Sequence, residues 1–153
     1  MSTRRVCATR PYELTQPACH EFLCRDGPGV IYVMSDTYVE TKRSAWAQKE
    51  LKSRTHRFKV GETNNVIQRL RDLRTGNPDL HLVAEVTVSD QRWTIEQTCH
   101  KALKLMAKTD PRIEHVLNEW YAAPDYRTVI LAQVYAESVI RGRFVSVTHH
   151  VSP

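Results

Sequence analysis

The stretch "HRFKVGETNNVIQRLRDLRTGNP" at residues 56–78 joins a strand-like start to a helical end through a glycine. Its first part, over 57–61, favours β-structure and is expected to break at the turn glycine Gly61. An asparagine pair then offers an N-cap, and apolar residues at helical spacing predict a helix over about 64–75. Gly76 and the Asn-Pro pair after it predict the end of that helix. The fold is therefore expected to contain a strand that leads directly into a helix.

Besides Arg57 at its start, this unit has four cations around the turn and along the helix: Lys59, Arg69, Arg71 and Arg74. Like charges near one turn repel one another unless an anion is usually present, so the unit suggests an anionic ligand. Arg69 lies at the margin of the apolar stripe, from which its planar fork suits a phosphate, whereas Arg71 points away. The alternative for Arg69 is a guanidinium that lies over the core and keeps its charge in water.

Further elements surround this unit. "VIYVM" at 30–34 and "LHLVAEVTV" at 80–88 predict two more strands. A helix is expected over about 91–107, capped by "SDQ", then an extended segment over 118–124 and a helix over about 125–140. This order predicts an α/β (α+β) domain, in which helices flank a small, mainly antiparallel sheet of three strands.

The chain is expected to have three parts. Residues 1–28 have no clear period and predict an arm or cap, 29–123 the main domain, and 124–153 a C-terminal helix and tail. A length of 153 residues suffices for one domain with its own hydrophobic core.

The connection over about 35–57 is polar and basic. Between 41 and 57 it holds six cations against the single acid Glu50: Lys42, Arg43, Lys49, Lys52, Arg54 and Arg57. Apolar residues among them are consistent with a short helix around 41–53. The segment either contacts DNA through its phosphates or forms a solvated charged face.

The net charge of +5 and the pI near 9.2 favour a polyanionic partner such as nucleic acid, with a solvated basic face as the alternative. No apolar run approaches the roughly 18–20 residues that a membrane helix needs, and the N-terminus lacks the apolar region of a secretory signal. We therefore expect a cytoplasmic protein that has no membrane partner.

Three of the four cysteines lie near the N-terminus, with His20 among them: Cys7, Cys19 and Cys24. Thiolates and imidazole suit zinc, but this spacing matches none of the usual finger or ribbon patterns. Reduced intracellular thiols are the simpler interpretation, and a zinc site stays open as the alternative.

The helix expected over 91–107 carries polar groups on an otherwise apolar face. Its stripe comprises Trp93, Glu96, Cys99, His100, Leu103, Met106 and Ala107. Burying an ionised carboxylate costs several kcal/mol, so Glu96 needs a partner. One interpretation is an ion pair with an arginine, or a half-exposed edge of the stripe. The other is a metal ligand at the floor of a cleft.

Four sequence features occur in a fixed order: "GVIYVM", "FKVGET" with a later arginine, a glutamate–histidine pair on a later helix, and "EWY". Together they resemble the GIY-YIG nuclease superfamily, and most of all its phage-type branch named after an open reading frame of phage T5. In that branch the second motif carries lysine where other members have tyrosine. The resemblance covers about residues 29–123. It implies a metal-dependent endonuclease that hydrolyses DNA phosphodiester bonds with Mg²⁺ or Mn²⁺.

The resemblance also assigns roles by position: catalysis to Tyr32, Lys59, Arg69 and His100, metal binding to Glu96, and the turn to Gly61. Glu96 is expected to hold the cation, and Arg69 to bind a non-bridging phosphate oxygen. Tyr32 would position or deprotonate the water, although a free tyrosine with a pKa of about 10 is a poor base at neutrality. An ammonium at Lys59 would favour the phenolate.

The chain departs from the family pattern at three points. The glycine of the first motif is Gly29, the connection from Tyr32 to Lys59 is longer than the usual hairpin, and the late asparagine has only Asn118 as a candidate. Two other functions stay open: a DNA-binding module of the same fold without cleavage, and a protein-interaction or inhibitor factor. A steep salt dependence of DNA binding would separate the last from the first two.

Overall fold

The computed structural model describes residues 26–36 and 56–150. The helix expected around 41–53 lies outside the described residues. Five of the six cations of the basic connection also lie outside the described residues: Lys42, Arg43, Lys49, Lys52 and Arg54. So do the four N-terminal zinc candidates: Cys7, Cys19, His20 and Cys24.

Six antiparallel strands form one sheet in the order β5–β6–β3–β2–β4–β7. Their bounds are β2 Gly29–Ser35, β3 His56–Thr63, β4 His81–Val88, β5 Glu114–Leu117, β6 Trp120–Ala123 and β7 Phe144–His149. The predicted α+β class is confirmed. The prediction of three strands is wrong, because β5, β6 and β7 extend the sheet on its two sides.

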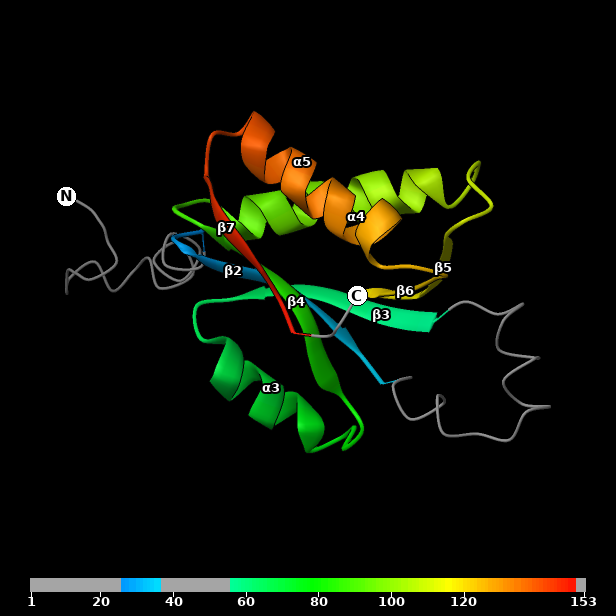
Figure 1. Cartoon of the computed structure of the whole chain (residues 1–153), viewed down its shortest axis with the longest axis horizontal. Helices are drawn as coiled ribbons and strands as arrows, with labels where there is room; N and C mark the ends of the chain where they lie inside the picture. The colour runs from blue at the N-terminus through cyan, green and yellow to red at the C-terminus, as the bar shows by residue number, and fades with distance from the viewer. Residues whose placement is uncertain (1–25, 37–55, 151–153) are drawn as a thin grey trace, which may run out of the picture.

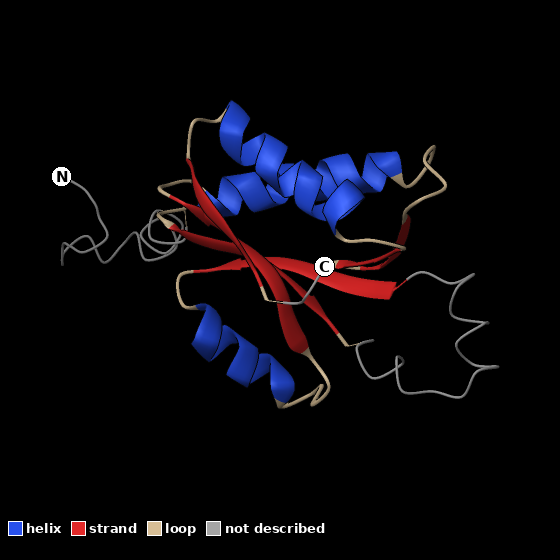
Figure 2. Cartoon of the chain, in the orientation of Figure 1, coloured by secondary structure: helices blue, strands red, loops and turns tan. Residues whose placement is uncertain are grey.

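Helices cover both faces of the sheet (Figures 1 and 2). The helix α3 (Val66–Arg74) lies on one face. On the other face lie α4 (Arg92–Met106) and α5 (Ala132–Ile140), the second of which continues a π-helical turn, η3 (Arg127–Leu131). The helix expected over 125–140 is therefore present, but it begins as a π-helix.

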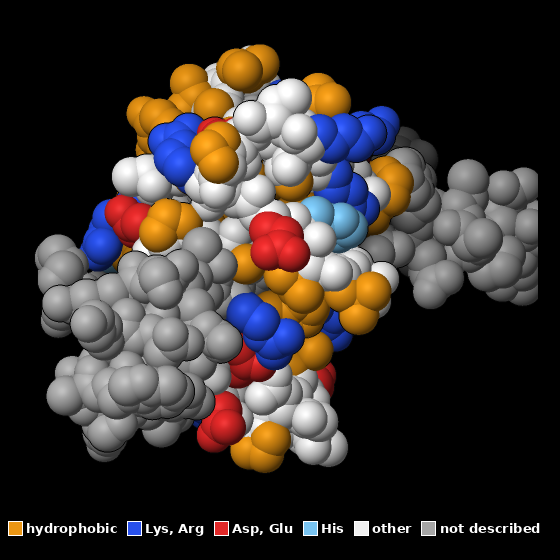
Figure 3. Space-filling model, turned by 90° about the vertical axis from the view of Figure 1, so that its right-hand side faces the viewer, with side chains coloured by type: hydrophobic (Ala, Val, Ile, Leu, Met, Phe, Trp, Pro, Cys, Tyr) orange, Lys and Arg blue, Asp and Glu red, His pale blue; other side chains and the backbone are white. Residues whose placement is uncertain are grey.

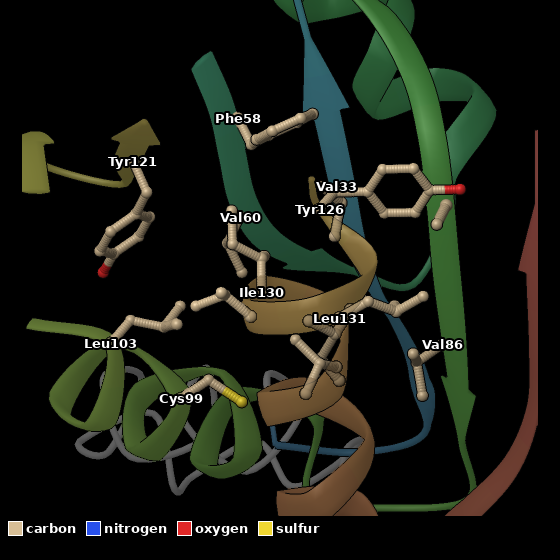
Figure 4. Packing of buried hydrophobic residues seen from close by; sticks show 14 of the residues in the cluster. Val33, Phe58, Val60, Val86, Cys99, Leu103, Tyr121, Tyr126, Ile130 and Leu131 are labelled. Carbon is tan, nitrogen blue, oxygen red and sulfur yellow. The ribbon is translucent and has the colours of Figure 1, made fainter. Parts of the chain in front are cut away.

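The alternation of side chains along β2 divides the core into two parts. Ile31 and Val33 face α4 and α5, where they join the larger apolar cluster, and Figure 4 shows Val33 among the side chains of that cluster. Tyr32 and Met34 face α3, which covers them with half-buried apolar side chains. The helix α3 itself has no fully buried residue. On this face, the half-buried side chains of α3 therefore separate the Tyr32 side chain from solvent.

The first turn of α4 is capped by a distant residue. Asp26 accepts hydrogen bonds from the backbone N–H of Thr94 at 2.9 Å and from its hydroxyl at 2.7 Å. Arg92, the first residue of the helix, donates through Nη1 to the carbonyl of Pro28 at 2.7 Å. The expectation that "SDQ" caps this helix is wrong, since the N-cap Gln91 makes no side-chain cap bond. The cap of α3 is confirmed, because the side chain of Asn65 accepts from the backbone N–H of Gln68 at 3.1 Å.

The strand β6 pairs with only the first half of β3. The paired positions run from His56 opposite Ala123 to Lys59 opposite Trp120, and the N–H of Val60 then donates to the carbonyl of Glu119 at 3.0 Å. Beyond this point, among the described residues, β3 has a strand partner only on the side of β2. Side chains from the two faces of the sheet can approach each other around this end of β3.

Candidate functional site

Four of the predicted site residues come from three elements that meet near the second half of β3, the strand that carries Lys59 and Gly61. Tyr32 lies on β2, Arg69 on α3, and Glu96 with His100 on α4. Tyr32 interacts electrostatically with Arg69 and with Glu96, although α3 and α4 cover opposite faces of the sheet. The fold therefore brings these predicted residues together, as the order of the motifs suggested.

Tyr32 packs directly against Gly61. The two residues are opposite one another in the β2–β3 pair, and only 1 % of Tyr32 is exposed. A Cβ atom at position 61 would lie 2.3 Å from the hydroxyl oxygen of Tyr32 and 2.4 Å from Cζ. Gly61 was expected to end the strand as a turn residue, whereas β3 continues to Thr63. A glycine stands here because the phenol ring occupies the place of its side chain.

The Tyr32 hydroxyl accepts a hydrogen bond from Nε of Arg69 at 3.4 Å. Burial raises the pKa of Tyr32 above its ordinary value, and the neighbouring Arg69 partly opposes this rise. The same hydrogen bond is the main reason that the pKa of Arg69 is raised. Arg71 bonds instead to the side chain of Gln68 at 3.1 Å. The two arginines thus separate as helical spacing predicted, with only Arg69 at the site.

Lys59 lies on the same face as Tyr32 but bonds to a different group. Its position is opposite Met34, and its Nζ lies 2.6 Å from Oε1 of Glu119, the residue just before β6. The cation beside the phenol is therefore Arg69, and Lys59 is the counter-ion of Glu119. The motif segment "EWY" contains Glu119, but sequence reasoning gave this carboxylate no role.

Glu96 and His100 form a buried pair on α4, with 3 % and 7 % of each residue exposed. Nε2 of His100 lies 3.0 Å from Oε2 of Glu96, and its Nδ1 lies 2.6 Å from the hydroxyl of Tyr121 on β6. Gln97 donates to the other carboxylate oxygen of Glu96 at 2.7 Å. The partner of Glu96 is thus a histidine rather than an arginine, and the carboxylate is not at a half-exposed edge.

Three side chains gather potential metal-ligand atoms in one place. Glu96, His100 and Glu119 each offer one ligand atom, and these three atoms lie within 4.8 Å of one another. No lysine or arginine of residues 26–36 and 56–150 pairs with the buried Glu96, so its charge is left for another cation to balance. Carboxylate oxygens are the ligands that Mg²⁺ and Mn²⁺ prefer. The residues present therefore fit a divalent cation of this kind.

Arg57 is the one cation of the basic connection within the described residues. Its guanidinium lies 2.6 Å from Asp36 and stacks over the Trp120 ring at 4.7 Å from the ring centre. On the face of the molecule that Figure 3 shows, basic side chains lie among acidic, histidine and apolar ones. Arg57 therefore has partners within the protein, and its predicted contact with DNA remains a prediction.

Comparison with known proteins places the chain in a family. Residues 29–137 match the model of the T5orf172 domain, which occurs in phage T5 open reading frames and in some nucleases. Neither the curated proteins nor the solved structures gave a match. Among the described residues, no helix is long and apolar enough to cross a membrane. The matched region contains Tyr32, Arg69, Glu96 and Glu119, and the chain belongs to the T5orf172 domain family.

Proposed function

We propose that the protein is a metal-dependent endonuclease of the GIY-YIG type that hydrolyses phosphodiester bonds in DNA. The observation that supports this most is the approach of three chemically different groups from opposite sides of one sheet. These are the buried hydroxyl of Tyr32, the guanidinium of Arg69 beside it and the buried carboxylate of Glu96. Membership of a family that is found in some nucleases agrees with this chemistry.

Arg69 binds the scissile phosphate in this mechanism. Its Nε reaches Tyr32, and the residue is exposed, so a phosphate can approach the guanidinium from solvent. A planar fork matches two phosphate oxygens and stabilises the charge that grows on them as the bond breaks. Lysine at this position would keep the charge but lose the fork.

Tyr32 orients the attacking water and takes its proton. The hydroxyl lies against Gly61 and accepts a hydrogen bond from Arg69, and these two contacts fix its direction. Arg69 contacts both the Tyr32 hydroxyl and the scissile phosphate. The pair Tyr32–Arg69 therefore aligns the attacking water with the phosphorus atom. Such alignment accounts for a large part of the barrier lowering in bond-breaking reactions of this type.

Glu96 and Glu119 are the residues that would hold the cation. When bound, Mg²⁺ or Mn²⁺ supplies Lewis-acid chemistry, which polarises the phosphate and favours departure of the leaving oxygen. Lys59 keeps Glu119 turned toward the site through their 2.6 Å ion pair. Lys59 therefore acts on the second carboxylate rather than on the phenol.

The test of this function is the cleavage of supercoiled plasmid in the presence of Mg²⁺ or of EDTA. We expect nicked or linear DNA with Mg²⁺ and none with EDTA. Arg69→Lys should lower the rate by about 100- to 1,000-fold, the usual effect of removing one preorganised donor. Arg71→Lys, on the same helix but bonded to Gln68, is the matched control and should cleave normally. Cleavage that is unaffected by EDTA would overturn the metal dependence, and DNA binding without any cleavage would favour the non-catalytic module.

Gly61→Ala tests the packing that fixes Tyr32. The new Cβ overlaps the phenol, so the ring must move, and a displacement of about 1 Å costs on the order of 100-fold in rate. Gly76→Ala is the control, since a side chain there meets no atom within 4 Å. Rates of plasmid cleavage and thermal unfolding curves would be compared for both variants. A Gly61→Ala protein with the normal rate would show that the position of Tyr32 is not critical.

A further inference from the structure

Tyr121, His100 and Glu96 form a continuous chain of hydrogen bonds inside the protein. The phenol of Tyr121 is bonded to Nδ1 of His100 at 2.6 Å, and Nε2 of His100 is bonded to Glu96 at 3.0 Å. Figure 4 shows the Tyr121 hydroxyl turned from β6 toward α4. The two rings also lie nearly parallel, with an interplanar angle of 19°. None of the three residues is more than 7 % exposed.

The chemistry of the two end groups determines where the protons lie. An ionised carboxylate only accepts, so the Nε2 of a neutral His100 must carry the proton that it shares with Glu96. Nδ1 then has a lone pair and accepts, which leaves Tyr121 as the donor. Burial raises the pKa of Tyr121, so its hydroxyl keeps the proton that it donates. When His100 is neutral, only one arrangement of protons satisfies both bonds.

We infer that Tyr121 and His100 are positioning residues for the metal-binding carboxylate of Glu96, with the Tyr121 hydroxyl holding the imidazole so that Nε2–H points at Oε2. This rests on the proposed function in one respect, namely that Glu96 binds the cation. Both ring nitrogens of His100 are occupied, so the histidine is neither a direct ligand nor the base. Lone pairs of Glu96 that His100 and Gln97 do not use, together with Glu119, remain for the cation.

The first experiment compares wild-type protein with Tyr121→Phe, which removes the hydroxyl and keeps the ring. In ¹⁵N spectra of the metal-free protein at mildly alkaline pH, His100 should show a protonated Nε2 and a hydrogen-bonded Nδ1. In Tyr121→Phe the Nδ1 resonance should move toward that of an unbonded acceptor. A wild-type His100 protonated on Nδ1, or a resonance unchanged by the substitution, would overturn the inference. This measurement does not depend on cleavage or on metal binding.

The second experiment measures Mn²⁺ affinity by electron paramagnetic resonance. Tyr121→Phe should weaken binding by about 10- to 100-fold, the usual effect of losing a group that orients a metal ligand. Tyr126→Phe is the control, because it removes another tyrosine–histidine hydrogen bond, that of Tyr126 with His149 at 3.1 Å. It should bind Mn²⁺ normally. If wild type binds Mn²⁺ and Tyr121→Phe binds it equally well, the inference fails, whereas a wild type that binds none contradicts the metal site of the proposed function.

A substitution of His100 separates positioning from direct coordination. His100→Gln keeps an N–H donor that can reach Glu96 but has no imidazole, so it should retain much more Mn²⁺ affinity than His100→Leu. Equal losses in the two variants would mean that the imidazole nitrogen itself binds the cation, and this would overturn the positioning role.

Discussion

Glu96→Gln should remove detectable DNA cleavage and leave DNA binding in place. The amide has the shape of the carboxylate but no negative charge, so it cannot balance a divalent cation. Its carbonyl oxygen can still accept from His100 at the position of Oε2, which preserves that buried hydrogen bond. The new amide nitrogen then replaces Oε1, so the exposed Gln97 side chain must turn to offer its oxygen instead of its nitrogen. Because a buried charge is removed without loss of volume, thermal stability should stay equal or rise.

The measurements for this variant are plasmid cleavage, Mn²⁺ binding and the fluorescence anisotropy of a labelled DNA duplex. Glu114→Gln on β5, where the carboxylate is exposed, is the matched control and should behave as wild type in all three. Normal cleavage by Glu96→Gln would remove the carboxylate from the mechanism. Loss of cleavage and DNA binding together would instead indicate that Glu96 supports the fold.

Tyr32→Phe should lower the cleavage rate by about 100- to 10,000-fold, the range for loss of a positioned proton acceptor. The substitution removes only the hydroxyl, and the ring still fills the space over Gly61. Stability should therefore change little compared with the effect on rate. A Tyr32→Phe protein that cleaves DNA at the normal rate would exclude the phenol from the reaction.

The pH dependence of the rate provides a sharper test of the same residue. Burial raises the pKa of Tyr32, so its hydroxyl is almost entirely protonated at neutral pH. If the phenolate accepts the proton, the rate should rise with pH from neutrality to beyond about pH 10, because the pKa of Tyr32 lies above that of a free tyrosine. Arg69 lowers the pKa of Tyr32, so Arg69→Gln should move the rising limb to higher pH, in addition to its loss of phosphate contact.

Tyr32→Phe should lack this rising limb. The profiles would be recorded as single-turnover rates on one plasmid substrate, with protein in excess. A limb that stays at the same pH in Arg69→Gln would show that another group accepts the proton, and a limb that survives in Tyr32→Phe would show the same.

The local parts of the fold could be predicted because their signals lie close together in the sequence. The N-cap at Asn65, the apolar stripe of α3 and the buried stripe of α4 all depend on residues within a few turns of one another. The same spacing correctly put Glu96 and His100 on one face of α4, and Arg69 at the margin of α3. These are the residues on which the resemblance also depended.

The outer strands were missed for a physical reason. All four residues of β5 are exposed, so that strand has no apolar alternation to mark it. The strand β7 lies at the edge of the sheet, and four of its six residues are exposed. Short edge strands owe their structure to the neighbour that they pair with, here β6 and β4. A pattern within the strand itself cannot reveal that neighbour.

The ion-pair partner of Lys59 could not be predicted from nearby residues in the sequence either. The strands β2 and β3 are neighbours in the sheet, and their register places Gly61, not Lys59, opposite Tyr32. The long connection between the two strands leaves this register open in the sequence. Glu119 lies 60 residues after Lys59, in the short turn between β5 and β6. Only the assembled sheet brings that carboxylate to the lysine and to Glu96.

The cap on α4 has a consequence for the smallest fragment that can be active. The family match begins at Gly29, but the first turn of α4 is bonded to Asp26, Gly27 and Pro28, which lie just before it. A fragment cut at the family boundary would lose these acceptors, and loss of one side-chain cap alone costs about 1 kcal/mol. Glu96 lies one turn further along that helix. The structural unit that holds Glu96 therefore begins upstream of the region by which its family is recognised.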